Sequence, residues 1–323
     1  MRLKYRIYVD GQEGTTGLMI AERLAARALA ADNIEIMKIA PDKRKDETER
    51  AKFLNTADVV FLCLPDAAAV DAVKLIHNHD VRVIDASTAH RMANGWAYGL
   101  PELSEKHREN IKYAGRVSVP GCFATGFNLI AYPLVKEGLL PADYPFACHA
   151  VTGYSGGGRK MIVAYKDSYR DLSHDSPCFY RLDLNHKHLP EMQAVPGLKN
   201  PPLFTPIVAD FYKGMTVAVP IFLNKLPLGC SLGVLREFFS KYYAGCHFVK
   251  MITDNAEAGL FKGDYLPATG CNDTNRVELF VFGNAEQALV VARLDNLGKG
   301  SSGAAVQCLN IMLNEDERLG LVV

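Results

Sequence analysis

The sequence predicts an α/β fold in two parts: a doubly wound parallel sheet, followed by an α+β part with a mixed, mostly antiparallel sheet. Three observations predict this fold. Short apolar strands alternate with helical segments over about the first 120 residues, an order typical of a parallel sheet with helices on both faces. After residue 122 the strand-like runs are longer, and loops rich in Gly and Pro join them. A chain of 323 residues also suits two domains, at about 150 residues each.

The first part is expected to hold four strands and two helices. Apolar runs place the strands at 5–10, 34–40, 59–64 and 81–85. Composition and spacing place the helices at 18–30 and 66–77. The stretch between the second and third strands, residues 42–52, is highly charged.

The second part is expected to begin with an apolar helix from Cys122 to about Gly138. Strand-like runs follow at 146–152, 204–211, 215–222, 277–282 and 288–295. A last helix, rich in small residues, is expected at 300–314. The chain shows no internal repeat and no low-complexity segment.

Composition excludes several classes of protein. The 36 basic and 36 acidic side chains cancel, which argues against a nucleic-acid partner. No apolar run reaches the roughly 18 residues of a membrane span, and the N-terminus lacks the apolar core of a signal peptide. The eight Cys include no CxxC pair. We therefore expect a reduced, cytoplasmic protein without a membrane partner.

A glycine-rich turn follows the first strand and predicts a Rossmann-type dinucleotide site. Gly11 permits the tight turn, Gly14 lets the backbone approach a pyrophosphate, and Gly17 permits close packing of helix on strand. The N–H groups at the helix start, with the hydroxyls of Thr15 and Thr16, can then bind phosphate. A plain strand–turn–helix is the alternative.

The residues after the second strand favour NADP over NAD. NAD enzymes usually place an acid at the end of this strand, to bind the 2′-hydroxyl of the ribose. Here Asp42 is followed by Lys43, Arg44 and Lys45, and consecutive bases suit a 2′-phosphate. Two alternatives stay open, namely a solvated charged loop and Asp42 acting as the NAD-type acid.

One cysteine stands apart from the other seven. The Pro-Gly turn at 120–121 places Cys122 at the start of an apolar helix. The helix dipole and free N–H groups favour a thiolate there, and the same groups can stabilise an oxyanion on a carbonyl that the thiolate attacks. Beside a nicotinamide, such a thiol suggests aldehyde-level chemistry through a thioester. The alternative is a buried structural cysteine.

A base for this thiol is expected in the segment HKHLPE, residues 186–191. His186 or His188 would act as general acid and base. The alternatives are a surface histidine and a metal ligand. No metal is expected, because neither His has a carboxylate or thiol at ligand spacing.

A further glycine-rich segment, GYSGGGRK at 153–160, follows an expected strand. Three consecutive Gly followed by Arg and Lys suggest that the backbone approaches an anionic or planar ligand. A flexible hairpin loop is the alternative.

Together these motifs resemble the N-acetyl-γ-glutamyl-phosphate reductases of arginine biosynthesis, of the shorter type. The motifs that carry the resemblance, in the order of the family and between about residues 5 and 310, are GxxGxxG, DASTAHR, YGLPEL, SVPGCFAT, GYSGGGRK, HKHLPEM and NLGKGSSGAAVQ. The resemblance implies NADPH-dependent reductive dephosphorylation of an acyl phosphate through a thioester on Cys122. It leaves the acid/base open between His186 and His188, with His186 favoured narrowly.

The resemblance also implies positions for the ligands. The nicotinamide would lie near Ser155, Gly157 and Asn296. The anionic substrate should meet cations, for which the candidates are Arg91, Arg159 and Lys160. His-Arg at 90–91 replaces the more usual Phe-Arg of the family, which leaves the role of Arg91 open.

The family pattern divides the chain into two domains. An NADP-binding domain at 1–121 would be rejoined by the C-terminal helix 297–323. The catalytic and substrate domain at 122–296 would also form a homodimer or homotetramer.

Two rival functions are considered. Aspartate-semialdehyde dehydrogenases share this architecture and chemistry, but they place Asn immediately before the nucleophile, where this sequence has Gly121. A non-catalytic NADP-binding sensor would keep Cys122 as a structural residue.

Overall fold

The computed structural model describes residues 4–12, 14–227, 229–253 and 259–323. The chain divides into two compact units. Unit 1 runs to Pro120 and takes in Ser301–Val322, and unit 2 spans Gly121–Gly300. Residues 297–300, which the family pattern assigned to the returning C-terminal segment, therefore belong to unit 2.

Unit 1 is built on a six-stranded sheet in the order β2-β1-β3-β4-β6-β5. All of its strand pairs are parallel, which confirms the predicted doubly wound sheet. The strands are β1 (Tyr5–Asp10), β2 (Ile34–Met37), β3 (Val59–Leu62), β4 (Arg82–Asp85), β5 (Ala97–Tyr98) and β6 (Arg116–Ser118). β5 and β6 have only two and three residues, so the sequence shows no apolar run long enough to predict them.

Both faces of this sheet are covered by helices, as a parallel sheet requires. Along β1, Ile7 and Val9 pack in a cluster with α1 and α10, whereas Tyr8 packs on the opposite face with α2 and α3. The helices of unit 1 are α1 (Thr15–Ala31), α2 (Glu47–Thr56), α3 (Asp66–Lys74), α4 (Glu105–Tyr113) and α10 (Gly303–Met312). The carboxyl ends of β1 and β3, which are parallel neighbours, lie beside the glycine-rich turn.

Unit 2 is built on a seven-stranded sheet in the order β11-β12-β13-β10-β7-β9-β8. β7 with β9 and β11 with β12 are parallel pairs, and the remaining pairs are antiparallel, which confirms the predicted mixed sheet. The strands are β7 (Ala147–Gly153), β8 (Cys178–Phe179), β9 (Leu203–Ala209), β10 (Met215–Phe222), β11 (Val249–Met251), β12 (Val277–Gly283) and β13 (Gln287–Leu294).

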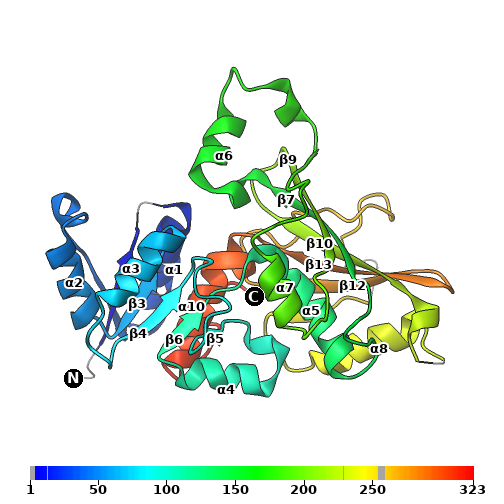
Figure 1. The fold of residues 1–323 in the computed structure, drawn as a ribbon, viewed down its shortest axis with the longest axis horizontal. Helices are drawn as coiled ribbons and strands as arrows, with labels where there is room; N and C mark the ends of the chain where they lie inside the picture. The colour runs from blue at the N-terminus through cyan, green and yellow to red at the C-terminus, as the bar shows by residue number, and fades with distance from the viewer. Residues whose placement is uncertain (1–3, 13, 228, 254–258) are drawn as a thin grey trace. The chain divides into compact units, whose positions relative to one another are not determined.

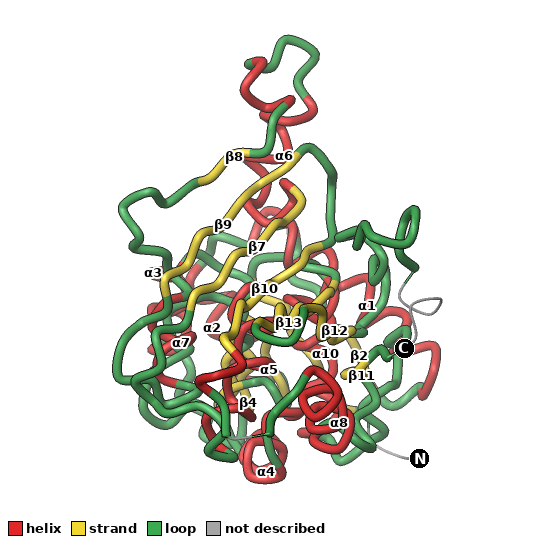
Figure 2. The backbone as a smooth tube through the Cα atoms, turned by 90° about the vertical axis from the view of Figure 1, so that its right-hand side faces the viewer, coloured by secondary structure: helices red, strands yellow, loops and turns green. Residues whose placement is uncertain are grey.

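Two helices of unit 2 lie on this sheet, and a third lies beyond its strand ends. α5 (Cys122–Lys136) packs on β10 and β13, and α8 (Leu232–Tyr242) packs on β11 and β12. α6 (Gly158–Lys166) and the loop after it extend past the ends of β7 and β9 (Figures 1 and 2). The segment GYSGGGRK is therefore a 3₁₀ turn (Tyr154–Gly157) leading into a helix, which corrects the alternative of a hairpin loop. A short helix, α7 (Leu189–Ala194), follows the two histidines.

Several shorter turns complete the structure. The other 3₁₀ turns are Pro41–Lys43, Pro101–Leu103, Leu172–Asp175 and Leu223–Lys225, and a π-helical turn at Gly298–Ser302 precedes α10. No helix in the described part of the chain is long and apolar enough to cross a membrane. All eight cysteines are free thiols.

Candidate active site

At two of the three glycines in the glycine-rich turn of unit 1, any side chain would clash with neighbouring backbone atoms. Gly11 has φ +90°, and a Cβ there would lie 2.4 Å from the carbonyl oxygen of Cys63. A Cβ on Gly17 would lie 2.2 Å from the oxygen of Gly11. Gly14 is different, because its nearest neighbours would be an ordinary 3.7 Å away. The fold itself therefore does not require glycine at 14, and the bare backbone there leaves room for a ligand.

α1 begins directly after this turn without a side chain capping its N-terminus. Its first N–H groups are therefore open to an anion such as a pyrophosphate. Thr15 and Thr16 are the first residues of the helix, and Thr16 is partly buried. The side chain of Thr15 lies outside the described residues.

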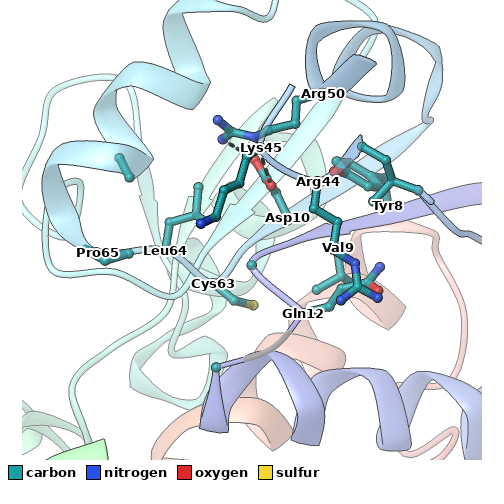
Figure 3. Close-up of a pocket in the computed structure, with 14 residues that line it drawn as sticks. Tyr8, Val9, Asp10, Gln12, Arg44, Lys45, Arg50, Cys63, Leu64 and Pro65 are labelled. Atoms are coloured by element: carbon teal, nitrogen blue, oxygen red, sulfur yellow. Dashed lines mark hydrogen bonds and ion pairs between the residues drawn. The ribbon is translucent and has the colours of Figure 1, made fainter. Parts of the chain in front are cut away.

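A pocket of about 470 Å³ opens beside the turn, a volume in the range of small-molecule sites (Figure 3). It is lined by Tyr8, Val9, Asp10, Gly11, Gln12, Gly14, Ile39, Arg44, Lys45, Arg50, Cys63, Leu64, Pro65 and Ala68. Burial, with the carboxylates of Asp85 and Asp10, raises the pKa of the Cys63 thiol, so this cysteine stays protonated. The lining combines apolar side chains with cations, which suits an adenosine with its phosphates.

The charged residues of this pocket come partly from the predicted basic segment. Arg44 and Lys45 line it, whereas Lys43 lines a separate hollow on the other side of the segment. Asp42, the alternative NAD-type acid, is not among the lining residues. α2 adds Arg50, a cation that sequence reasoning missed because this helix was not foreseen.

Cys122 opens helix α5 in unit 2, as the sequence predicted. The cap position is Gly121, which has no side chain to accept the first N–H groups of the helix. The rest of the helix is almost entirely buried, while Cys122 itself is partly exposed. The thiol thus stands at a helix N-terminus, where N–H groups can stabilise negative charge on sulfur or on a carbonyl oxygen.

His188 lies directly against the residue that precedes this cysteine. A Cβ on Gly121 would meet the His188 ring at 2.3 Å from Nε2 and 2.5 Å from Cδ2 and Cε1. The imidazole therefore occupies the space that any side chain at 121 would fill. This explains why Gly121, and not Asn, stands before the cysteine in this chain.

His186 supports His188 from behind. Its Nδ1 accepts a hydrogen bond of 3.1 Å from the backbone N–H of His188. In the neutral ring the proton is then on Nε2. Phe123 and Phe204 pack on the ring edge-on, at 5.6 and 5.2 Å between centroids. The structure thus places the His188 ring against Gly121, the residue before Cys122, and the choice of acid/base between His186 and His188 stays a prediction.

Two further residues of this site carried no assigned role in the sequence. Glu191, 1% exposed, accepts the N–H of Gly121 at 3.1 and 3.3 Å through its two carboxylate oxygens. Tyr180 lies close enough to Cys122 that burial and the sulfur's charge together raise the pKa of its phenol. Glu191 stood in the motif HKHLPEM, but only the fold shows that the start of α7 returns to the start of α5.

The loop between β13 and α10 approaches the cysteine from the other side. A Cβ on Gly300 would lie 2.8 Å from Cβ of Cys122. The amide of Asn296 holds the loop, because Oδ1 accepts the N–H of Gly214 at 2.8 Å and Nδ2 donates to Oγ of Ser155 at 3.0 Å. Asn296 and Ser155, both 2% exposed, thus tie two predicted cofactor segments together within unit 2.

The remaining predicted residues are more widely placed. Gly157 packs on Met161, whose sulfur would lie 2.4 Å from a Cβ at 157. Arg159 and Lys160 are exposed in the first turn of α6. Arg91 belongs to unit 1, where its Nε donates to the carbonyl oxygen of Val119 at 3.0 Å. Across residues 4–12, 14–227, 229–253 and 259–323, no three His, Cys, Asp or Glu side chains gather into a group that could hold a metal ion.

The chain matches two known protein families, one in each part. Residues 14–112 match the NAD binding domain of semialdehyde dehydrogenases, and residues 122–296 match their dimerisation domain.

Curated relatives match over nearly the whole chain. N-acetyl-gamma-glutamyl-phosphate reductase of Trichormus variabilis is 48% identical over 98% of this chain and 99% of its own length. The protein of the same name from Chelativorans is 44% identical, over 96% and 98% of the two chains.

Solved structures show the same fold at much lower identity. Aspartate semialdehyde dehydrogenase II of Vibrio cholerae superposes with a TM-score of 0.70 at 12% identity, over 96% of this chain and 98% of that one. The enzyme of Candida albicans, solved with NADP, gives a TM-score of 0.60 at 15% identity, over 96% and 98%. At these identities the likeness concerns the fold alone.

Proposed function

Because this chain belongs to the N-acetyl-γ-glutamyl-phosphate reductase family, we propose that it reduces N-acetyl-L-glutamyl 5-phosphate to N-acetyl-L-glutamate 5-semialdehyde in arginine biosynthesis, with NADPH as reductant. The observation that carries the chemistry is the geometry of one thiol. Cys122 stands at an uncapped helix N-terminus, and the ring of His188 lies against the residue before it.

Cys122 is the nucleophile of this proposal. Its sulfur attacks the acyl carbon, a carbon–sulfur bond forms, and the bond from carbon to the phosphate oxygen breaks, so that inorganic phosphate leaves. The N–H groups of the first turn of α5 stabilise the oxyanion on the way. The nicotinamide, when bound, supplies a hydride to the thioester carbon. The resulting thiohemiacetal then releases the aldehyde as the carbon–sulfur bond breaks and the electron pair returns to sulfur.

His188 moves the proton in these steps. It takes the thiol proton of Cys122 before attack and returns a proton to the sulfur at the end, with its Nε2 on the side of Gly121. His186 holds the backbone of His188 through Nδ1, and Glu191 holds Gly121 through its carboxylate. These two are positioning residues for the pair that reacts.

The cofactor is a nicotinamide nucleotide, and the pocket of unit 1 supports NADP in particular. Gly11, Gly14 and Gly17 shape the pyrophosphate turn, and the backbone at Thr15 and Thr16 offers N–H groups. Arg44 and Lys45 line the pocket, whereas Asp42 does not, so the charge there suits a 2′-phosphate better than a ribose hydroxyl. Ser155, Gly157 and Asn296 are proposed for the nicotinamide end.

The substrate carries an α-carboxylate and an acyl phosphate, so its site requires cations. Arg91, Arg159 and Lys160 are proposed for this role, and the exposure of the last two on α6 leaves them accessible to such an anion. In this proposal unit 1 supplies the pyrophosphate turn and the basic residues of the nucleotide site, and unit 2 supplies the thiol, the histidines and the cations of α6.

Unit 2 also supports self-association as a homodimer or homotetramer. On β10, Met215, Val217, Val219 and Ile221 are buried, whereas the alternate residues from Thr216 to Phe222 are partly or fully exposed. An apolar strand in mid-sheet with one open face is typical of an interface between subunits. This face lies in the region that matches a dimerisation domain. Free thiols throughout suit the cytoplasm.

One assay in the reverse direction tests the function. Purified protein is mixed with NADP⁺, phosphate and N-acetylglutamate semialdehyde, and the NADPH absorbance is followed. We expect turnover in the wild type and none in Cys122→Ser, with NADPH binding intact. Cys230→Ser, another partly exposed cysteine, is the matched control and should stay active.

The same assay separates the rival functions. Turnover with aspartate semialdehyde instead would overturn the substrate, and this rival is already disfavoured by the 42–48% identity to the reductases. Tight NADPH binding without turnover of either aldehyde would indicate a sensor.

A further inference from the structure

The pocket of unit 1 contains an ion pair that the proposed function does not use. Asp10 is the last residue of β1, and Arg50 reaches it from α2 (Figure 3). Arg50 Nη2 donates to Asp10 Oδ2 at 2.7 Å, and Nε donates to Oδ1 at 3.3 Å, a bidentate pair. Both side chains are largely buried, with 6% of Asp10 and 20% of Arg50 exposed.

Tyr8 completes the surroundings of this carboxylate. Burial together with the charge of Asp10 raises the pKa of its phenol, so Tyr8 stays protonated. The hydrogen bond to Asp10 likewise raises the pKa of Arg50, which is therefore always charged. The carboxylate is thus paired with a permanent cation beside a protonated phenol.

The pair matters because of where the carboxylate lies. Asp10 immediately precedes Gly11, so its negative charge stands at the turn that would receive a pyrophosphate. An unpaired carboxylate at this position would repel the phosphates of any dinucleotide. Nε and Nη2 of Arg50 both donate to Asp10, so the guanidinium is poorly placed to bind a phosphate through a second bidentate contact.

We propose that Arg50 is a positioning residue for cofactor binding that acts by neutralising Asp10, and that it does not read the 2′-phosphate. In this proposal Arg44 and Lys45 bind the 2′-phosphate. The proposal rests on the proposed nucleotide site and makes a prediction specific to it: loss of Arg50 weakens NADPH and NADH alike, because both carry the pyrophosphate, and removal of the Asp10 charge restores both.

A double-substitution experiment tests this, with dissociation constants for NADPH and NADH measured by calorimetric titration of the intact protein. We expect Arg50→Met to raise both constants by about tenfold or more and by the same factor. The Asp10→Asn/Arg50→Met double variant should return both to within about threefold of the wild type. Arg50→Lys, which keeps the charge, should also stay near wild type and serves if Arg50→Met fails to fold. Lys52→Met, on the same helix but outside this pocket, is the matched control.

Three outcomes overturn the proposal. A loss confined to NADPH would make Arg50 a ligand of the 2′-phosphate. A double variant as weak as Arg50→Met, or weaker, would show that the pair serves only to fasten α2 to β1. An Arg50→Lys variant as weak as Arg50→Met would show that guanidinium shape matters and not charge. By contrast, a wild-type protein that binds neither nucleotide would overturn the proposed function itself.

Discussion

The substitution Gly121→Ala tests the placement of His188 with a single methyl group. Gly121 has φ −70° and ψ 146°, a conformation that alanine adopts without strain. The added Cβ would nevertheless stand 2.3 Å from Nε2 of His188, whereas ordinary contacts begin at 3.4 Å. The ring therefore has to retreat by about 1.1 Å, and misplacement of a catalytic group by about 1 Å can cost about 100-fold in rate. Overpacking should also cost about 1–3 kcal/mol of stability.

The assay for this prediction compares kcat/KM, nucleotide affinity and urea unfolding in wild type and variant. We expect kcat/KM for the semialdehyde to fall about 100-fold, while NADPH affinity stays unchanged. Gly115→Ala is the matched control, because a Cβ at 115 meets no atom within 4 Å. Unchanged kcat/KM in Gly121→Ala would refute the reasoning, because turnover would then not depend on the position of the His188 ring.

Three further predictions concern the same fold. Gly300→Ala should slow both turnover and alkylation of Cys122 by iodoacetamide, because its Cβ would lie 2.8 Å from that of Cys122; equal alkylation rates would contradict the close approach. Glu191→Ala leaves the buried N–H of Gly121 without its acceptor, so the free energy of unfolding measured by urea titration should fall by about 1–3 kcal/mol. An unchanged free energy of unfolding would count against this hydrogen bond. Burial and the charge of Lys106 lower the pKa of His107 from 6.5, so the folded state binds fewer protons than the unfolded chain and stability falls as the pH drops below 6.5. His107→Gln should therefore lessen the difference between the free energies of unfolding at pH 7.5 and pH 5.5. An unchanged difference would contradict this prediction.

The sequence predicted the fold class because both sheets have strong local signals. The glycine turn after β1 and the apolar strands at 59–62 and 82–85 require a parallel sheet, and the long strands β10 and β13 form the centre of the mixed one. α2 was not foreseen, because it buries only Leu54 and so lacks an apolar stripe. The last helix was expected from residue 300, but it begins at Gly303 after a π-helical turn that no periodicity reveals.

The site was predictable by residue type and less so by role. Cys122 at a helix start follows from the Pro-Gly turn before an apolar run. The choice between His186 and His188 does not follow from the sequence, because only the packing of α7 against α5 shows which ring lies on Gly121. Arg50 could not be placed without α2, and Lys43 could not be separated from Arg44 and Lys45 without the turn at 41–43 that directs them apart.

The central claim is that the acyl group passes through a thioester on Cys122, and one measurement tests it most directly. The protein is mixed with N-acetylglutamyl phosphate in the absence of NADPH, quenched in acid, and analysed by intact and peptide mass spectrometry. We expect a stoichiometric N-acetylglutamyl adduct on the peptide that carries Cys122, accompanied by a burst of inorganic phosphate, and neither of these in Cys122→Ser. Normal turnover without an adduct, or an adduct on another residue, would contradict the account.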